Sequence, residues 1–145
     1  MRFLRLFTTA SILCFAAPTF AQGWVTFTSE LDRFQIQSLA ELVMHETTYD
    51  SEYGAVMPAR VYSYEDGANR YSVSVIDYTD AEQIHADRPD RSEADYELYW
   101  EVDVRASVAY AAMNLRQRVG EVTYDAYHYI DRVEGHQLQI TNEIG

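Results

Sequence analysis

The chain has very little cysteine: Cys14 is the only one among 145 residues. No disulfide can therefore form within the chain, and the fold must depend on a hydrophobic core. Lysine is absent, since all 11 basic side chains are arginine, which excludes Schiff-base catalysis by a lysine. Only 6 glycines are present, and none has the spacing of a phosphate-binding loop. No apolar run reaches the roughly 20 residues that a membrane-spanning helix needs.

Positive charge is also scarce. The chain has 23 acidic against 11 basic side chains, a net charge of -12. A field of this sign repels phosphate backbones and anionic lipid surfaces, so we expect neither nucleic acid nor an anionic membrane as a partner. Two interpretations of the acidity remain open: it keeps an exported protein soluble, or it forms a surface for cations or a basic partner.

The N-terminus has the three parts of a secretory signal peptide. Arg2 and Arg5 form a positive region, and Leu6–Phe15 is largely apolar. Thr19-Phe20-Ala21 follows as a small-x-small cleavage site. We therefore expect residues 1–21 to be cleaved after Ala21, which leaves residues 22–145 as a single domain in the periplasm or outside the cell.

Cleavage would change the composition of the working protein. It would remove Cys14, and the loss of Arg2 and Arg5 would take the net charge from -12 to about -14. A lipid anchor on Cys14 fits badly, because Ile12 and Leu13 precede it where a lipoprotein has a small residue.

Alternating apolar residues predict five strands in the first half of the chain. Their expected bounds are Trp24–Thr28, Arg33–Gln37, Leu42–Tyr49, Ala55–Tyr64 and Arg70–Tyr78. Turn signals separate them at Leu31–Asp32, Asp50–Gly54 and Glu65–Asn69. The first two strands are expected to form a hairpin with Phe34 and Ile36 on one face, and Pro58 predicts an edge or a bulge.

The second half predicts one long helix and two more strands. A polar connection over Asp77–Asp95 contains a short helical turn at Ala81–His85, and the long helix follows over Ala94–Arg118. Ser92 is its candidate cap and Gly120 its stop. The last strands are Glu121–Val133 and His136–Thr141, with the turn at Glu134–Gly135. The fold class is therefore α+β: a twisted antiparallel sheet with one long helix packed on one face.

Several segments resemble a group of small exported proteobacterial proteins of unassigned function. These are Gly23-Trp24, Arg33-Phe34, Tyr53-Gly54, Met57–Tyr62, Tyr71–Tyr78 and Gly135–Leu138. Their layout is similar to the PsbP/Mog1 type of domain, which implies an assembly or binding module and transfers no catalytic residue. Similar chains continue past the segment that matches Gly135–Leu138 into another strand. Either Thr141 ends the last strand here, or a downstream segment is missing.

Few residues suggest chemistry. Gly-x-Ser-x-Gly is absent, and His45, His85, His128 and His136 include no His-x-x-x-His pair. The turn at Glu134–Gly135 would place His128 and His136 on opposite faces of their hairpin. His85, Asp87 and Asp90 form the densest potential zinc or calcium cluster, although an ordinary solvated loop is the competing interpretation. We assign no catalytic, cofactor-binding or metal-binding residue and expect no cofactor.

The 12 tyrosines also have two interpretations: half-buried faces of a sheet, or a tyrosine-lined binding cleft. Three hypotheses for the whole chain follow. It is an exported non-enzymatic module that binds a protein or small ligand of the cell envelope through its sheet or a helix–sheet cleft. Alternatively, it is an envelope hydrolase that uses paired carboxylates or a weakly bound metal, or it is a fragment of a longer domain.

Overall fold

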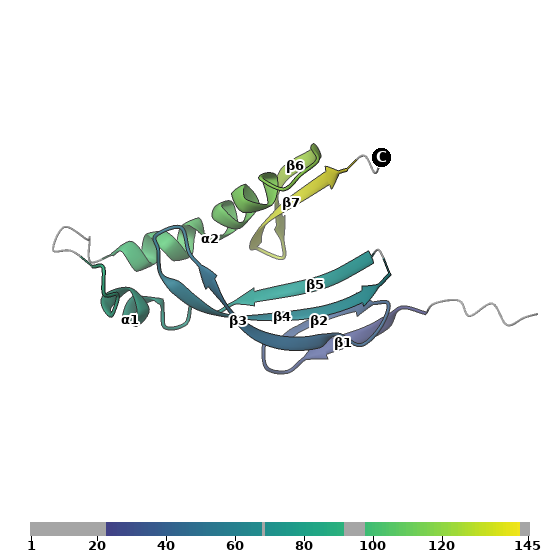
Figure 1. Cartoon of the computed structure of the whole chain (residues 1–145), viewed down its shortest axis with the longest axis horizontal. Coiled ribbons are helices and arrows are strands. Elements are labelled where there is room, and N and C mark those ends of the chain that lie inside the picture. Colours follow the sequence, from purple (N-terminus) through teal and green to yellow (C-terminus); the bar gives the residue numbers. More distant parts are fainter. Residues whose placement is uncertain (1–22, 68, 92–97, 143–145) are drawn as a thin grey trace, which may run out of the picture.

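The computed structural model describes residues 23–67, 69–91 and 98–142. Within these ranges the chain is α+β, but its strands form three small antiparallel sheets and not the single sheet expected from the sequence (Figure 1). The strands are β1 (Val25–Ser29), β2 (Phe34–Ser38), β3 (Val43–Asp50), β4 (Val56–Asp66), β5 (Asn69–Ile76), β6 (Glu121–Ile130) and β7 (Val133–Thr141). The helices are α1 (Ala81–Ala86) and α2 (Tyr99–Arg116).

The first sheet is the predicted N-terminal hairpin, β1 with β2. Phe27 pairs with Ile36, and Ser29 pairs with Phe34, so the alternating pattern does place Phe34 and Ile36 on one face. Phe27 and Phe34 pack against Tyr62 of β4, with ring centroids 5.6 and 5.1 Å from its ring. The hairpin therefore covers part of one face of the second sheet.

The second sheet has the order β3-β4-β5, so β4 is the central strand. The expectation that Pro58 marks an edge or a bulge is wrong, because Pro58 pairs with Thr48 in an uninterrupted ladder. On the edge of β4 that faces β5, Pro58 lies where the pairing between β4 and β5 ends. The Asp77 amide donates a hydrogen bond to the Pro58 carbonyl at 2.9 Å. Proline has no N–H and therefore donates no hydrogen bond to β5. A central strand tolerates proline here because the missing donor falls at the end of the ladder.

The connection after β5 contains α1 where a helical turn was predicted. The long helix starts later than predicted, at Tyr99, since Leu98 is a turn residue with φ -102° and ψ 14°. The proposed cap Ser92 lies outside the described residues. The helix ends at Arg116, before Gly120, whose φ of +136° only glycine adopts readily.

The third sheet is the β6–β7 hairpin, and its turn is not at the predicted position. Asp131 and Arg132 form a two-residue turn between Ile130 and Val133, with φ values of +49° and +70°. Glu134 and Gly135 belong to β7. The third sheet packs against α2 through β7.

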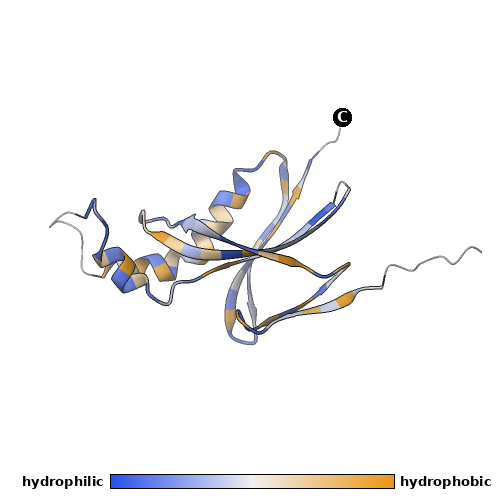
Figure 2. Cartoon of the chain, turned by 60° about the horizontal axis from the view of Figure 1, so that its bottom comes forward, coloured by the Kyte–Doolittle hydropathy of each residue, from blue (hydrophilic) through white to orange (hydrophobic). Residues whose placement is uncertain are grey.

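A second core joins the sheet to both helices. Ala55, Met57 and Ala81 are fully buried, and Trp100 at the start of α2 packs against them. Figure 2 shows hydrophobic and hydrophilic residues alternating along the strands, as expected for sheets with one covered face. Among the described residues, neither helix has the length and hydropathy needed to cross a membrane.

Candidate functional site

A cleft of about 250 Å³ lies between the second sheet and α2. We call it the helix–sheet cleft. It is lined by Tyr49, Ile76, Tyr78, Ser107, Val108 and Ala111. Sites for drug-sized ligands usually measure roughly 300–1,000 Å³, so this cleft suits a smaller molecule.

Three elements position the lining residues. Tyr49 lies near the end of β3, and Tyr78 follows the end of β5, where the ladder with β4 stops beside Pro58. Ser107 and Ala111 are four residues apart on α2 and therefore share one face of the helix. The cleft is thus formed between one end of the second sheet and the middle of α2.

Asp103 lies one helical turn before Ser107 on the same face of α2. Only 1% of its side chain is exposed. The Oδ2 atom of Asp103 is 2.8 Å from the Nε2 atom of His85 on α1; because a carboxylate can only accept, this nitrogen carries the proton. The other oxygen, Oδ1, is buried and has no hydrogen-bond partner within the described part of the chain.

Tyr78 provides a second buried polar atom beside the cleft. Its hydroxyl group has no hydrogen-bond partner among the described residues. Burial, together with the nearby charge of Asp103, raises the pKa of Tyr78 to about 12, so the hydroxyl is protonated at neutral pH. Burial also raises the pKa of Tyr49, whose ring lies 6.2 Å from that of Tyr110, edge to face.

The cleft contains hydrogen-bonding capacity that the described residues do not use. Buried polar atoms normally find partners, so the hydroxyl of Tyr78, a residue that lines the cleft, leaves hydrogen-bonding capacity that a bound molecule can use. A His–Asp pair resembles part of a catalytic triad, but a triad also needs a nucleophile beside the histidine. Ser107, the serine of the cleft, donates its hydroxyl to the Val104 carbonyl at 2.8 Å.

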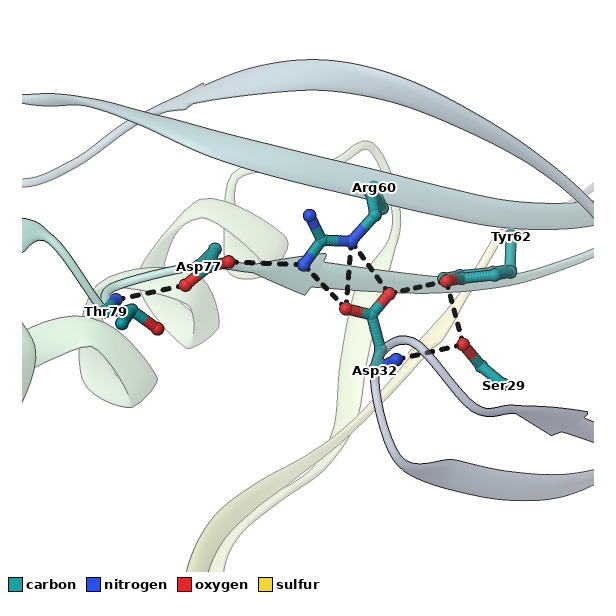
Figure 3. A network of polar contacts seen from close by, with 6 residues as sticks. All are labelled: Ser29, Asp32, Arg60, Tyr62, Asp77 and Thr79. Atoms are coloured by element: carbon teal, nitrogen blue, oxygen red, sulfur yellow. Dashed lines mark hydrogen bonds and ion pairs between the residues drawn. The ribbon is translucent and has the colours of Figure 1, made fainter.

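A second polar cluster joins the first two sheets (Figure 3). Asp32, in the β1–β2 turn, accepts from Arg60 Nη2 at 2.6 Å and from the Tyr62 hydroxyl at 2.5 Å. Asp77 accepts from the Thr79 amide at 3.0 Å and from Arg60 at 3.3 Å. Arg60 lowers the pKa of Asp32, and Thr79 followed by Arg60 lowers that of Asp77. These polar groups bind one another, so the cluster holds the hairpin on β4 and offers little to a ligand.

The residues predicted as a potential metal cluster do not converge. His85 contacts Asp103, whereas Asp87 accepts from Gln83 at 2.7 Å and Asp90 accepts from Arg88 at 2.7 Å. The described ranges contain no group of three or more side chains placed to hold a metal ion.

The two histidines of the third sheet lie on its two strands, His128 on β6 and His136 on β7. His128 pairs with Gly135 and His136 with Tyr127, because the turn is at Asp131. Their opposite orientation is confirmed, since neighbouring positions of a strand face opposite sides. His136 instead contacts Asp125, which also accepts from Arg116 at the end of α2.

The sequence led us to assign no role to Asp103, although its neighbours along the predicted helix indicate a buried carboxylate. The chain places one acidic side chain in a helical stripe with Tyr99, Trp100 and Tyr110. A carboxylate among aromatic side chains is expected to have a partner when buried. Its partner comes from α1, which the spacing of residues along α2 cannot reveal.

No known protein family, curated protein or solved structure matches this chain.

Proposed function

We propose that the chain is an exported, non-enzymatic binding module that takes a small ligand in the helix–sheet cleft. One observation supports this most directly: the cleft combines apolar walls with the buried hydroxyl of Tyr78, a lining residue that has no hydrogen-bond partner among the described residues. An apolar pocket with a few unsatisfied polar groups is the usual form of a small-molecule site. The signal peptide predicted over residues 1–21 supports a periplasmic or secreted location, with cleavage after Ala21.

An envelope hydrolase is the alternative, and the buried His85–Asp103 pair is the observation that favours it. The residues that line the cleft include neither of these two side chains. A hydrolase would need His85 to reach a substrate or a water molecule there. The alternative therefore predicts that His85→Ala abolishes turnover, whereas the binding module has no turnover to lose.

The PsbP/Mog1-like layout remains a proposal about the fold. It is supported by the α+β composition and by antiparallel strands flanked by a long helix. The resemblance would agree with a role in binding or assembly, and a protein partner in the cell envelope would then contact the surface around the cleft.

The cleft can be tested without knowing its ligand. Ala111→Trp would fill the cleft from α2, and Ala109→Trp, on an exposed position of the same helix, is the matched control. We expect ligand-observed NMR with a library of small cationic, neutral and anionic compounds to find compounds that bind the unmodified chain and the control but not Ala111→Trp. If every compound that binds the unmodified chain also binds Ala111→Trp, the cleft is not the binding site.

A further inference from the structure

We infer that the helix–sheet cleft binds a small neutral molecule with a carbonyl oxygen, which accepts a hydrogen bond from a tyrosine hydroxyl of the lining while the rest of the molecule contacts the apolar wall. This inference rests on the proposed binding function and adds the chemical class of the ligand.

The lining of the cleft indicates a neutral ligand. Its described residues are two tyrosines, one serine and three aliphatic residues. Burial raises the pKa of both Tyr49 and Tyr78, so neither is ionised at neutral pH. A charged group that entered this cleft would lose its hydration without gaining an ion pair from the lining. The net charge of -12 repels anions as well. It attracts cations to the surface, but no lining residue replaces their hydration.

The tyrosine hydroxyls determine the polar group of the ligand. Tyr49 and Tyr78 both line the cleft, and the hydroxyl of each is buried with no hydrogen-bond partner within the described ranges. A phenol donates a hydrogen bond better than it accepts one, because its oxygen shares electron density with the ring. A buried donor without an acceptor costs free energy. A carbonyl oxygen, which only accepts, is therefore the matching group.

The serine of the lining does not offer a competing donor. The Ser107 hydroxyl donates to the Val104 carbonyl of the same helix at 2.8 Å, so its only proton is already used. The two tyrosines are therefore the donors of the lining that remain for a ligand.

The walls and the volume of the cleft limit the rest of the ligand. Ile76, Val108 and Ala111 provide apolar surface, and Tyr49 adds an aromatic ring that packs edge to face on Tyr110. An apolar cavity of roughly 150 Å³ can hold benzene. The volume of about 250 Å³ therefore accommodates one ring with a short carbonyl substituent.

Four probes of similar shape separate these contributions in ligand-observed NMR titrations. Acetophenone has the carbonyl oxygen, α-methylstyrene has a methylene group in its place, and benzoate and benzylammonium carry a negative and a positive charge. We expect acetophenone to bind at least tenfold more tightly than either charged probe. The apolar wall should bind α-methylstyrene too, so the carbonyl contact is identified from the variants and not from these two affinities.

Tyr49→Phe and Tyr78→Phe each remove one hydroxyl and keep the ring. We expect at least one of them to weaken acetophenone about fivefold, the effect of one hydrogen bond, and to change α-methylstyrene less than twofold. Tyr129→Phe is the matched control, because Tyr129 is 72% exposed on the third sheet and lies outside the lining. It should leave the affinity for every probe unchanged.

Folding of the variants is checked by circular dichroism and thermal melting, and a second measurement needs no variant. The carbonyl ¹³C chemical shift of bound acetophenone, obtained by extrapolation of the titration, should lie at higher frequency than in a hydrocarbon solvent, because hydrogen bonding deshields this carbon. A bound shift equal to that in the hydrocarbon would show that the carbonyl has no donor and would overturn the inference.

The remaining outcomes distinguish the ligand class from the site. The carbonyl inference is wrong if acetophenone does not bind, or if neither tyrosine variant weakens it more than α-methylstyrene. The neutral class is wrong if benzoate or benzylammonium binds as tightly as acetophenone. In either case, loss of the bound probes in Ala111→Trp would keep the cleft as a binding site. If Ala111→Trp binds every probe as the unmodified chain does, the proposed function fails together with the inference.

Discussion

Two buried carboxylates of this chain, Asp32 and Asp103, differ in how completely their oxygens are hydrogen-bonded. Asp32 has partners on both oxygens, because Arg60 and the Tyr62 hydroxyl donate to it and only 3% of its side chain is exposed. Asp103 has a partner on one oxygen only among the described residues. A fully satisfied carboxylate stabilises the fold, whereas a buried oxygen without a partner carries a desolvation cost.

Asp32→Asn should destabilise the fold, because an amide cannot accept from Arg60 and Tyr62 as a carboxylate does. We expect a loss of about 2 kcal/mol in the free energy of unfolding, measured with urea at neutral pH. The exposed pair of Glu65 and Arg70 gives the control: Glu65→Gln should cost less than about 0.5 kcal/mol. Equal losses in the two variants would contradict a structural role for Asp32.

The same residue makes stability depend on acid. Arg60 lowers the pKa of Asp32 below its usual value near 3.8 in the folded state. Its contribution is therefore complete above pH 4–5 and is lost as the pH falls through 3.8 and below. Asp32→Asn should lose less stability than the unmodified chain over this range. Some acid dependence should remain, because Arg116 and His136 lower the pKa of Asp125 in the same direction.

Tyr78 should make stability depend on alkali. Its folded pKa, about 12, lies above the usual value of 10.0 because burial disfavours the phenolate. The stabilisation is therefore present below pH 10 and is lost as the pH rises from 10 toward 12. Thermal melting between pH 9 and 11.5 should show a smaller loss for Tyr78→Phe than for the unmodified chain. Tyr129→Phe, at a 72% exposed residue, should behave like the unmodified chain.

At the scale of elements, the β6–β7 turn shows why a sequence with the composition of a turn predicted the wrong turn position. Glu134-Gly135 has the composition of a turn, yet Gly135 pairs with His128 inside the hairpin. A Cβ at Gly135 would lie 3.7 Å from its nearest neighbour, the His128 carbonyl, so the strand does not require glycine here. Asp131 and Arg132 instead adopt positive φ values, which cost free energy for residues other than glycine.

Arg132→Gly should therefore stabilise the chain by about 0.5 kcal/mol, because glycine adopts a φ of +70° without strain. Glu134→Gly should destabilise it by about 1 kcal/mol, because glycine weakens a strand. Denaturant unfolding of the two variants locates the turn. Stabilisation by Glu134→Gly together with destabilisation by Arg132→Gly would indicate that the turn lies at Glu134–Gly135, as the sequence predicts.

Most strands and both helices could be predicted from the sequence, because alternation and helical spacing are local properties. The start of α2 and the turn of the last hairpin could not, since Leu98 and Asp131 carry weaker signals than Ser92 and Gly135. The division into three sheets was also missed, because an alternating strand shows which face is apolar and not which strand lies beside it. The cleft is lined by Tyr49, Tyr78 and Ser107 from three separate segments, and only tertiary packing brings these together.

At the scale of the whole molecule, two of the three sheets in the described ranges are two-stranded hairpins, and such hairpins are marginal when isolated. Each is attached by an arginine–aspartate contact: Arg60 with Asp32 for the first hairpin, and Arg116 with Asp125 for the last. The chain has no cysteine after Cys14. These contacts and the two small cores therefore stabilise the described fold without disulfides, which stabilise many exported domains.

The proposed export is the property of the whole chain that can be tested most directly. Expressed from Met1 in a Gram-negative host, the chain should be recovered from the envelope or the medium with Gln22 as its first residue, as measured by intact mass and N-terminal sequencing. Ala21→Asp removes the small residue before the expected cleavage site and should leave the leader attached. Glu30→Asp is a control outside the leader and should be processed normally. Recovery of the unmodified chain in the cytoplasm with residues 1–21 still present would contradict the export proposal and leave the binding proposal to be judged on the cleft alone.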